Sequence, residues 1–475
     1  MNYSMTEGTS GSMRFFAALW LSKLADRLIK LVAPNRGTNF AGKLAVKLDP
    51  EFLSHFQYDP QKVLFVTGTN GKSSTTNLIV HLAKNAGFTV TSNIEGANLM
   101  TGIATALLRD AHFNGRLDAD FIVMEVDERS LPLIQPRFPT GNLLVTNLQK
   151  DQMGRNGDPS FIYRKLAAQI SPDMNLYLNN EEPRCHSLKR YAQAQIHFYG
   201  VARNERSFHK SPHIPRLPCP FTHQEIQFEY MNVDNVGPFF NLDRSFTSLP
   251  DDQVESRVYD VDFDGEKFSY KGLTFNMPYK VSPMLYNYAS ALSVAENLFG
   301  LSLEQCQDAF AKFTNIDGRF VEFVYKNKRM RYMRVKQENP DNLQNALKGI
   351  EKEQQSCSVV LYNLPFVADF NPFYHDCFFN FDSDLEPLKH SNVMQIVDTG
   401  CSFTAEESLK SGAIWLKSQG FPAEKVLCAQ ASDARGILDI MAQTPGDICY
   451  LICPMADYET LEPYIRKENG YAQDR

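Results

Sequence analysis

Short apolar runs alternate with longer stretches of helical spacing from residue 60 onward. Strands are predicted over residues 63–67, 88–91, 120–125 and 142–146, with helices at 72–86 and 97–108 between them. Strands separated by helices form right-handed crossovers, which build a mainly parallel sheet covered by helices on both faces. The predicted fold class is therefore α/β.

The pattern changes at residues 200–265, which are rich in Pro, His, Asn and aromatic residues and lack helical spacing. We interpret this stretch as a β-rich insert. Helices are predicted at 283–298 and 303–313, and strand–helix alternation resumes beyond residue 320. The expected division is an N-terminal tail and amphipathic helix (1–58), a central domain with the insert (59–318), and a smaller, Rossmann-like α/β domain (319–475).

The apolar stretch at residues 13–32 is interrupted by charged residues, whereas a membrane span needs about 20 mostly uncharged ones. At helical spacing one face carries Phe16, Leu19, Trp20, Leu24, Leu28 and Leu31. This face is expected to pack on its own domain. The alternative is contact with an anionic membrane surface, because residues 1–50 hold seven Lys and Arg against three Asp and Glu.

Composition narrows the class of protein. With 475 residues the chain is long enough for about three modules of ~150 residues. A net charge of -7 argues against a general nucleic-acid binder. The nine cysteines are odd in number and never spaced C-x-x-C, which is typical of reduced thiols in a cytoplasmic protein.

The strongest chemical signal is the segment 67–74, Thr-Gly-Thr-Asn-Gly-Lys-Ser-Ser, between a predicted strand and a predicted helix. Gly68 and Gly71 let the backbone curl so that its N–H groups face phosphate oxygens. Lys72 can reach the terminal phosphates, and the Ser73 hydroxyl can ligate Mg²⁺. This segment, called the phosphate loop below, predicts a nucleotide site.

A magnesium site also needs a carboxylate. Glu125 ends an apolar strand, and open α/β sheets place ligand groups at the carboxyl ends of their strands. Asp127 and Glu128 follow it, and we interpret them as solvated loop acids. Glu125 is thus the predicted metal ligand.

Several segments together resemble the Mur ligases, a superfamily that includes folylpolyglutamate synthases. They are the phosphate loop, Glu125, residues 147–155 and 178–183, the helix with Asn287, and Gly318-Arg319. Residues 93–98 and Gln152 resemble the branch of ligase subunits that amidate lipid II. The resemblance runs from about Arg14 to the C-terminus and is specific through residue 320.

The resemblance implies a role for each matching residue. ATP would be held by Gly68, Thr69, Asn70, Gly71, Lys72, Ser73, Ser74, Asn287 and Arg319. Within this set Asn287 would contact adenine, and Arg319 would approach the nucleotide from a hinge. Mg²⁺ would be bound by Ser73 and Glu125.

The reaction implied by the resemblance is ATP-dependent formation of a carbon–nitrogen bond. The α-carboxylate of D-glutamate in lipid II would be activated as an acyl phosphate and amidated to D-isoglutamine in cell-wall synthesis. Cys401 lacks a nucleophile-elbow pattern, so ammonia would come from a GatD-like glutamine amidotransferase in a heterodimer. The expected location is the cytoplasm, with a peripheral position at the inner face of the membrane as an option.

The insert departs from the family pattern of four zinc-binding cysteines. Cys219 matches one ligand position, but the others fall on Thr222 and near Asn241 and Asp243. A structural zinc site takes four N or S ligands. We therefore predict that the insert is a degenerate ribbon without zinc, held together by aromatic packing.

The second departure concerns the catalytic aspartate that the family places in the C-terminal domain. Asp369 is the candidate, but matching it needs a shift of one residue, without which Phe370 occupies the position. A solvated loop aspartate is the competing interpretation. Two other functions stay open: a Mur-type ligase that adds an amino acid to another carboxylate, and a diverged ATP-binding scaffold.

Overall fold

The computed structural model describes residues 13–32, 39–94, 97–150, 158–209, 217–313, 320–335, 340–351, 353–362, 383–400 and 406–468. The chain forms two compact units, a larger one drawn from residues 1–315 and a smaller one drawn mainly from residues 316–475. Each unit has its own sheet, and each is described by itself.

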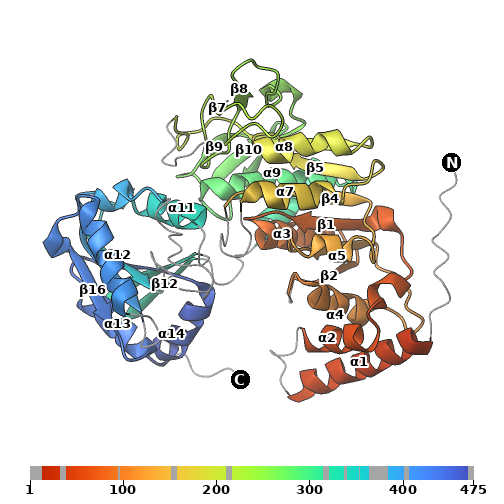
Figure 1. The fold of residues 1–475 in the computed structure, drawn as a ribbon, viewed down its shortest axis with the longest axis horizontal. Coiled ribbons are helices and arrows are strands. Elements are labelled where there is room, and N and C mark those ends of the chain that lie inside the picture. Colours follow the sequence, from red (N-terminus) through yellow and green to blue (C-terminus); the bar gives the residue numbers. More distant parts are fainter. Residues whose placement is uncertain are drawn as a thin grey trace. The chain divides into compact units, whose positions relative to one another are not determined.

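The larger unit is built on a nine-stranded sheet with the order β11-β10-β9-β6-β5-β4-β1-β3-β2 (Figure 1). Its strands are β1 (Val63–Thr67), β2 (Val90–Ser92), β3 (Phe121–Glu125), β4 (Asn142–Val145), β5 (Asn175–Asn179), β6 (Ile196–Val201), β9 (Ser256–Asp262), β10 (Lys267–Tyr270) and β11 (Leu273–Asn276). Neighbours from β9 to β2 run parallel, and β9, β10 and β11 pair antiparallel. The predicted mainly parallel sheet is confirmed.

Helices cover both faces of this sheet. They are α1 (Met13–Val32), α2 (Phe40–Leu48), α3 (Lys72–Asn85), α4 (Met100–Asp110), α5 (Leu131–Ile134), α7 (Pro159–Ala167), α8 (Pro183–Ser187), α9 (Ser282–Asn297) and α10 (Leu303–Ala311). Consecutive residues of β1 enter different cores, because successive side chains of a strand point to opposite faces of the sheet. Phe65 packs in the core that contains α1, α2 and α4, and Val66 packs in the core that contains α3, α9 and α10.

Helix α1 packs on its own domain, as predicted, but only Leu19 and Phe16 of the predicted face take part in the core. The buried positions are Phe15, Ala18, Leu19, Ser22 and Asp26. Trp20, Leu24, Leu28 and Leu31, expected inside, are 54%, 55%, 54% and 80% exposed. The small side chains of Ala18 and Ser22 let neighbouring helices approach closely, which explains why this less apolar face is buried. Among the described helices, none combines the length and the apolar character needed to cross a membrane.

The predicted insert is only partly separate from the main sheet. β7 (Ile226–Phe228) and β8 (Phe239–Asn241) form a two-stranded antiparallel sheet. Strand β9, which also falls within residues 200–265, instead pairs with β6 in the main sheet. Aromatic rings pack the small sheet, with Phe246 lying 5.0 Å from Phe239 and 5.2 Å from Phe221 between ring centroids.

The buried carboxylate of Glu181, two residues after β5, is hydrogen-bonded to β6 and α9. It accepts hydrogen bonds from the backbone N–H of Val201 at 3.0 Å and from the hydroxyl of Tyr286. Full burial removes the carboxylate from water and raises the pKa of Glu181 to about 7. The folded protein therefore holds a proton here that the unfolded chain loses near its usual pKa of 4.5.

Replacing Glu181 with glutamine is expected to flatten the pH dependence of stability. A raised folded-state pKa makes the wild-type free energy of unfolding fall as the pH rises from about 4.5 to about 7, by roughly 1.4 kcal/mol per pH unit. Glutamine keeps an oxygen that accepts from the Val201 N–H and offers an N–H that can donate to the Tyr286 oxygen, but it carries no charge, so E181Q should gain ~2–3 kcal/mol relative to wild type at pH 8. Urea unfolding at pH 5 and pH 8 measures this; identical slopes in both proteins would contradict it.

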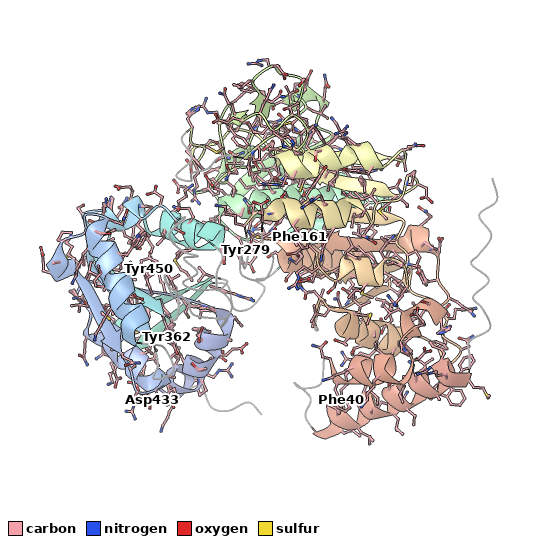
Figure 2. The ribbon with its side chains drawn as sticks, in the orientation of Figure 1. Phe40, Phe161, Tyr279, Tyr362, Asp433 and Tyr450 are labelled. Carbon is pink, nitrogen blue, oxygen red and sulfur yellow. The ribbon has the colours of Figure 1, made fainter. Side chains whose placement is uncertain are left out.

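The smaller unit has a six-stranded sheet with the order β12-β13-β17-β14-β15-β16. Its strands are β12 (Phe320–Tyr325), β13 (Lys328–Arg334), β14 (Cys357–Tyr362), β15 (Val393–Gly400), β16 (Val426–Gln430) and β17 (Ile448–Cys453), and its helices are α11 (Pro340–Glu351), α12 (Glu406–Ser418), α13 (Ala434–Gln443) and α14 (Met455–Glu468). All neighbours are parallel except β12 and β13. Tyr362 and Tyr450, labelled in Figure 2, lie on central strands of this sheet. The predicted second α/β architecture is confirmed.

Candidate nucleotide-binding site

The phosphate loop connects the carboxyl end of β1 to the start of α3. Gly68 has a φ of 122° and Gly71 a φ of 84°, a region that side chains rarely adopt. A Cβ atom on Gly68 would lie 2.4 Å from Thr146 Oγ1, and one on Gly71 would lie 2.6 Å from Asn287 Oδ1. Both positions therefore require glycine for conformation and for space.

The segment after β4 holds the loop from the other side. Asn147 Oδ1 accepts the backbone N–H of Asn70 at 2.9 Å, and Asn147 Nδ2 donates to the Asn70 carbonyl at 2.9 Å. Asn70 Nδ2 donates to Gln149 Oε1 at 3.0 Å. These bonds fix the curl of the loop. Sequence reasoning assigned no role to Gln149, although polar residues directly after an apolar strand were the available signal.

Lys72 points back into the loop. Its ammonium donates to the carbonyls of Gly68 and Thr69 and lies 3.0 Å from Glu128 Oε2. Lys72 is 6% exposed and Glu128 is 2% exposed, so this ion pair is buried. The prediction that Glu128 is a solvated loop acid is therefore wrong. The chain turns directly after β3, which carries Glu128 under the loop, where the lysine charge compensates its burial.

Glu125 ends β3 beside the phosphate loop, because its register partner on β1 is Val66, two residues before Gly68. Asn98 Nδ2 donates to Glu125 Oε1 at 2.9 Å. The side chain of Asn93 accepts from the Glu125 backbone N–H and donates to its carbonyl, both at 2.8 Å. The carboxylate is thus held at the edge of the sheet next to the start of α3, where Ser73 lies in the first turn.

The residues present fit a magnesium nucleotide. The glycine curl leaves no room for a Cβ atom, and the first turn of α3 offers backbone N–H groups that no helical carbonyl uses. The buried hydroxyls of Ser74 and Thr75, at the same helix end, have no hydrogen-bond partner among the described residues. A hydroxyl and one carboxylate suit Mg²⁺, which takes its remaining ligands from phosphates and water.

Asn287 joins the site from α9. It is buried, its Nδ2 lies 3.1 Å from Met284 Sδ, and its Oδ1 lies against Gly71. The structure therefore brings Asn287 together with the loop residues 68–74 and Glu125. Arg319 and Asp369 lie outside the described residues, as do Gln152 and Cys401.

The four positions that correspond to the zinc-binding cysteines of the family lie in and around the small sheet of β7 and β8. Cys219 is buried among Ile226, Phe239 and Phe246. Asn241 Nδ2 donates to Thr222 Oγ1 at 3.5 Å, while Asp243 Oδ1 accepts from the backbone N–H of Ser245 at 3.0 Å. In the parts of the chain that the structure describes, no group of three His, Cys, Asp or Glu side chains is placed to hold a metal ion.

Comparison with known proteins shows similarity to Mur ligases in sequence and in fold. Residues 66–229 match the Mur ligase middle domain. The fold resembles a pseudomurein peptide ligase type C from Methanothermus fervidus (TM-score 0.63, 14% identity, 85% of this chain and 79% of that one). It also resembles MurF from Thermotoga maritima in complex with ADP (TM-score 0.55, 15% identity, 91% and 85%). The chain therefore contains a Mur ligase middle domain, and its fold is similar to that of Mur ligases over most of its length.

Curated relatives that match more than four fifths of the chain include two MurT subunits. The MurT subunit of lipid II isoglutaminyl synthase (glutamine-hydrolyzing) from Staphylococcus aureus strain COL is 28% identical over 82% of this chain and 85% of the relative. The MurT subunit from Streptococcus pneumoniae R6 is 25% identical over 82% and 84%. A UDP-N-acetylmuramate–L-alanine ligase from Christiangramia forsetii matches 57% of this chain and 46% of its own length, at 29% identity.

Proposed function

We propose that the chain is the synthetase subunit of a lipid II isoglutaminyl synthase. It would amidate the D-glutamate α-carboxylate of lipid II with ATP. The observation that carries the proposal is the phosphate loop, with the buried Lys72 inside it and Glu125 at its edge. The similarity to MurT subunits over 82% of the chain supports this choice of reaction within the family.

The reaction has two steps, phosphoryl transfer and displacement of phosphate by ammonia. A carboxylate oxygen of D-glutamate attacks the γ-phosphorus of ATP, the bond to ADP breaks, and an acyl phosphate results. Ammonia then attacks the carbonyl carbon, phosphate leaves with the former carboxylate oxygen, and one proton passes to a base. Phosphorylation is needed because a carboxylate resists attack by ammonia.

The residues of the phosphate loop would catalyse the phosphoryl-transfer step. Its N–H groups and Lys72 would bind the phosphates and stabilise charge on the transferred group. Ser73 and Glu125 would hold Mg²⁺, which would supply positive charge to offset that of the phosphates. Asn287 would contact adenine, and Arg319 would approach the nucleotide from residues 318–319. Asp369 is the proposed base that takes the proton from ammonia.

Ammonia would come from a GatD-like glutamine amidotransferase bound to this chain as a heterodimer. The printed name of the MurT relatives describes a glutamine-hydrolyzing enzyme of which they are one subunit. We propose the same division of labour here, at the inner face of the membrane where a lipid-linked substrate is exposed. The proposed cofactors are ATP and Mg²⁺, without zinc.

The proposal is tested by reconstitution with lipid II, ATP, Mg²⁺, glutamine and a glutamine amidotransferase. Mass spectrometry should show the loss of about 1 Da that accompanies conversion of a carboxylic acid to an amide, with one ADP per amide. ADP release that requires an amino acid instead of ammonia would favour the amino-acid ligase. No product with either would favour a scaffold. Unchanged amidation by D369A would remove Asp369 from the mechanism.

Replacing Glu125 with glutamine is expected to weaken magnesium binding at the site. The variant keeps an oxygen for the hydrogen bond from Asn98 but removes the charge that attracts the cation. The Mg²⁺ concentration for half-maximal ATP turnover should rise about tenfold, while the protein stays folded. Asp127→Asn serves as a control two residues away. An unchanged Mg²⁺ dependence in E125Q would exclude Glu125 as a ligand.

A further inference from the structure

Helix α1 turns an apolar stripe away from the protein. Met13, Trp20, Leu24, Leu28 and Leu31 recur at helical spacing on the face opposite the buried one, and each is at least 54% exposed. In Figure 1 the helix lies along a border of the larger unit. Neighbouring aromatic residues enlarge the stripe, since Phe113 is 57% exposed and packs edge-on against Trp20 with ring centroids 6.2 Å apart.

A cavity of about 460 Å³ opens beside this stripe, between α1, α4, β2 and the end of α3. Five of its lining residues are basic: Lys23, Arg27, Lys30, Lys84 and Arg109. Two, Asp26 and Asp110, are acidic. The lining therefore carries a net charge of +3, whereas the whole chain carries -7. Such a concentration of positive charge in a cavity attracts anions.

The acidic residues do not neutralise the cavity. Asp26 is buried and accepts hydrogen bonds from Arg109, among them Nε to Oδ2 at 3.0 Å and Nη2 to Oδ1 at 2.8 Å, and its Oδ2 also lies 3.7 Å from Lys30 Nζ. One negative charge is thus shared between two cations, so the lining keeps its positive excess. The side chains of Lys23, Arg27 and Lys30 remain on the flank of α1 that faces the cavity, next to the apolar stripe.

The cavity and the nucleotide site share one neighbouring residue. One wall of the cavity is Asn93, the residue that hydrogen-bonds the Glu125 backbone in both directions. Another is Lys84, which lies 12 residues along α3 from Lys72, or ~18 Å at the helical rise of 1.5 Å per residue. A molecule anchored among these cations could therefore extend a sugar and a short peptide to the phosphate loop, since an extended residue spans up to ~3.5 Å.

We propose that this cavity binds the diphosphate of a polyprenyl-linked substrate while the apolar stripe of α1 lies in the surface of the membrane. The negative charge of the diphosphate would be attracted by the basic residues of the cavity. The lipid around the attached chain would bury the apolar side chains of Trp20, Leu24 and Leu28. Soluble phosphate compounds provide the charge but not the lipid. The inference rests on the proposed function for the identity of the substrate, but the binding it describes needs neither ATP nor ammonia.

Flotation of the full-length protein with lipid vesicles tests the proposal. Three vesicles are compared: phosphatidylcholine alone, phosphatidylcholine with a polyprenyl diphosphate, and phosphatidylcholine with phosphatidylglycerol at the same surface charge. Binding is expected to be strongest to the diphosphate vesicles and weakest to the neutral ones. Inorganic diphosphate, titrated by calorimetry, should bind at least tenfold more weakly than the polyprenyl form.

Two pairs of exposed residues separate the roles of charge and apolar surface. R27Q/K30Q should reduce binding to the diphosphate vesicles about 25-fold, because each basic residue near an anionic surface contributes ~1 kcal/mol. L24S/L28S should reduce binding to every vesicle about tenfold or more. The matched control is K267Q/L242S, since both residues are exposed and lie far from α1 in the sequence. Circular dichroism and thermal melting should show that all variants are folded.

The outcomes distinguish this inference from the proposed function. Equal binding to diphosphate and phosphatidylglycerol vesicles would overturn the cavity as a diphosphate site. Equal affinity for inorganic and polyprenyl diphosphate would overturn the membrane contact. Wild-type binding by R27Q/K30Q would overturn the cavity as the diphosphate site, and wild-type binding by L24S/L28S would overturn the membrane contact. Strong, variant-sensitive binding without any amidation in reconstitution would instead support the cavity while the proposed reaction fails.

Discussion

Replacing Lys72 with alanine is expected to lower ATP-dependent turnover about a thousandfold and to lower the free energy of unfolding by ~3–5 kcal/mol. The first effect follows because the ammonium is the cation placed inside the phosphate loop. The second follows because Glu128, 2% exposed, loses the charge that lies 3.0 Å from its carboxylate. Removing one partner of a buried ion pair leaves an uncompensated charge, which costs more than the pair contributes.

A double variant separates the two effects. In K72M/E128Q both charges are gone and the side-chain volumes are kept, so stability should return to within ~1–2 kcal/mol of wild type. Turnover should stay as low as in K72A, because methionine offers no positive charge to the phosphates. Urea denaturation measures the first quantity and ADP release measures the second. Recovery of turnover together with stability would show that Lys72 acts only on the fold.

The phosphate loop was predictable because its chemistry is local in sequence. Two glycines, a lysine and two serines follow an apolar strand within eight residues, and their spacing alone sets a left-handed backbone at Gly71 before the helix. The position of Glu125 beside the loop was predictable for a related reason, since parallel strands end at the same edge of a sheet. Each inference needed only the order of strand, loop and helix.

The contacts that hold the loop were not predictable in this way. Gln149 is 79 positions from Asn70 and Glu128 is 56 positions from Lys72. A side chain in a short loop after a strand can face water or turn beneath a neighbouring loop, and the sequence pattern is the same in both cases. Burial of Glu128 became evident only when the path of the chain between β3 and α5 was known.

Helix α1 shows a similar limit. The apolar spacing identified the helix and its packing on the domain, but most of the predicted face is exposed, because a face can also be buried through small residues such as Ala18 and Ser22. A hydrophobic face is buried within its own protein only when it does not contact a partner protein or a membrane instead. The exposed row that contains Trp20 and Leu24 therefore indicates a contact surface, which we propose lies against the membrane.

Replacing Gly68 with alanine is expected to weaken ATP binding more than a hundredfold, which corresponds to ~3 kcal/mol. The new Cβ would lie 2.4 Å from Thr146 Oγ1 and 2.8 Å from the Asn147 carbonyl oxygen, and the backbone at a φ of 122° would be strained as well. The Thr146 side chain can rotate away, but the Asn147 carbonyl belongs to the segment that binds the loop backbone. The loop must therefore move, and its N–H groups would no longer converge on the phosphates.

Gly87 provides a matched control for this variant. It also has a positive φ, 91°, but a Cβ atom there would meet nothing within 4 Å. G87A should therefore lower the free energy of unfolding by ~1–2 kcal/mol through backbone strain and leave the affinity for ATP unchanged. Calorimetric titration of both variants with ATP and Mg²⁺ separates strain from steric displacement of the loop. Wild-type affinity in G68A would mean that the curl of the phosphate loop does not bind the nucleotide.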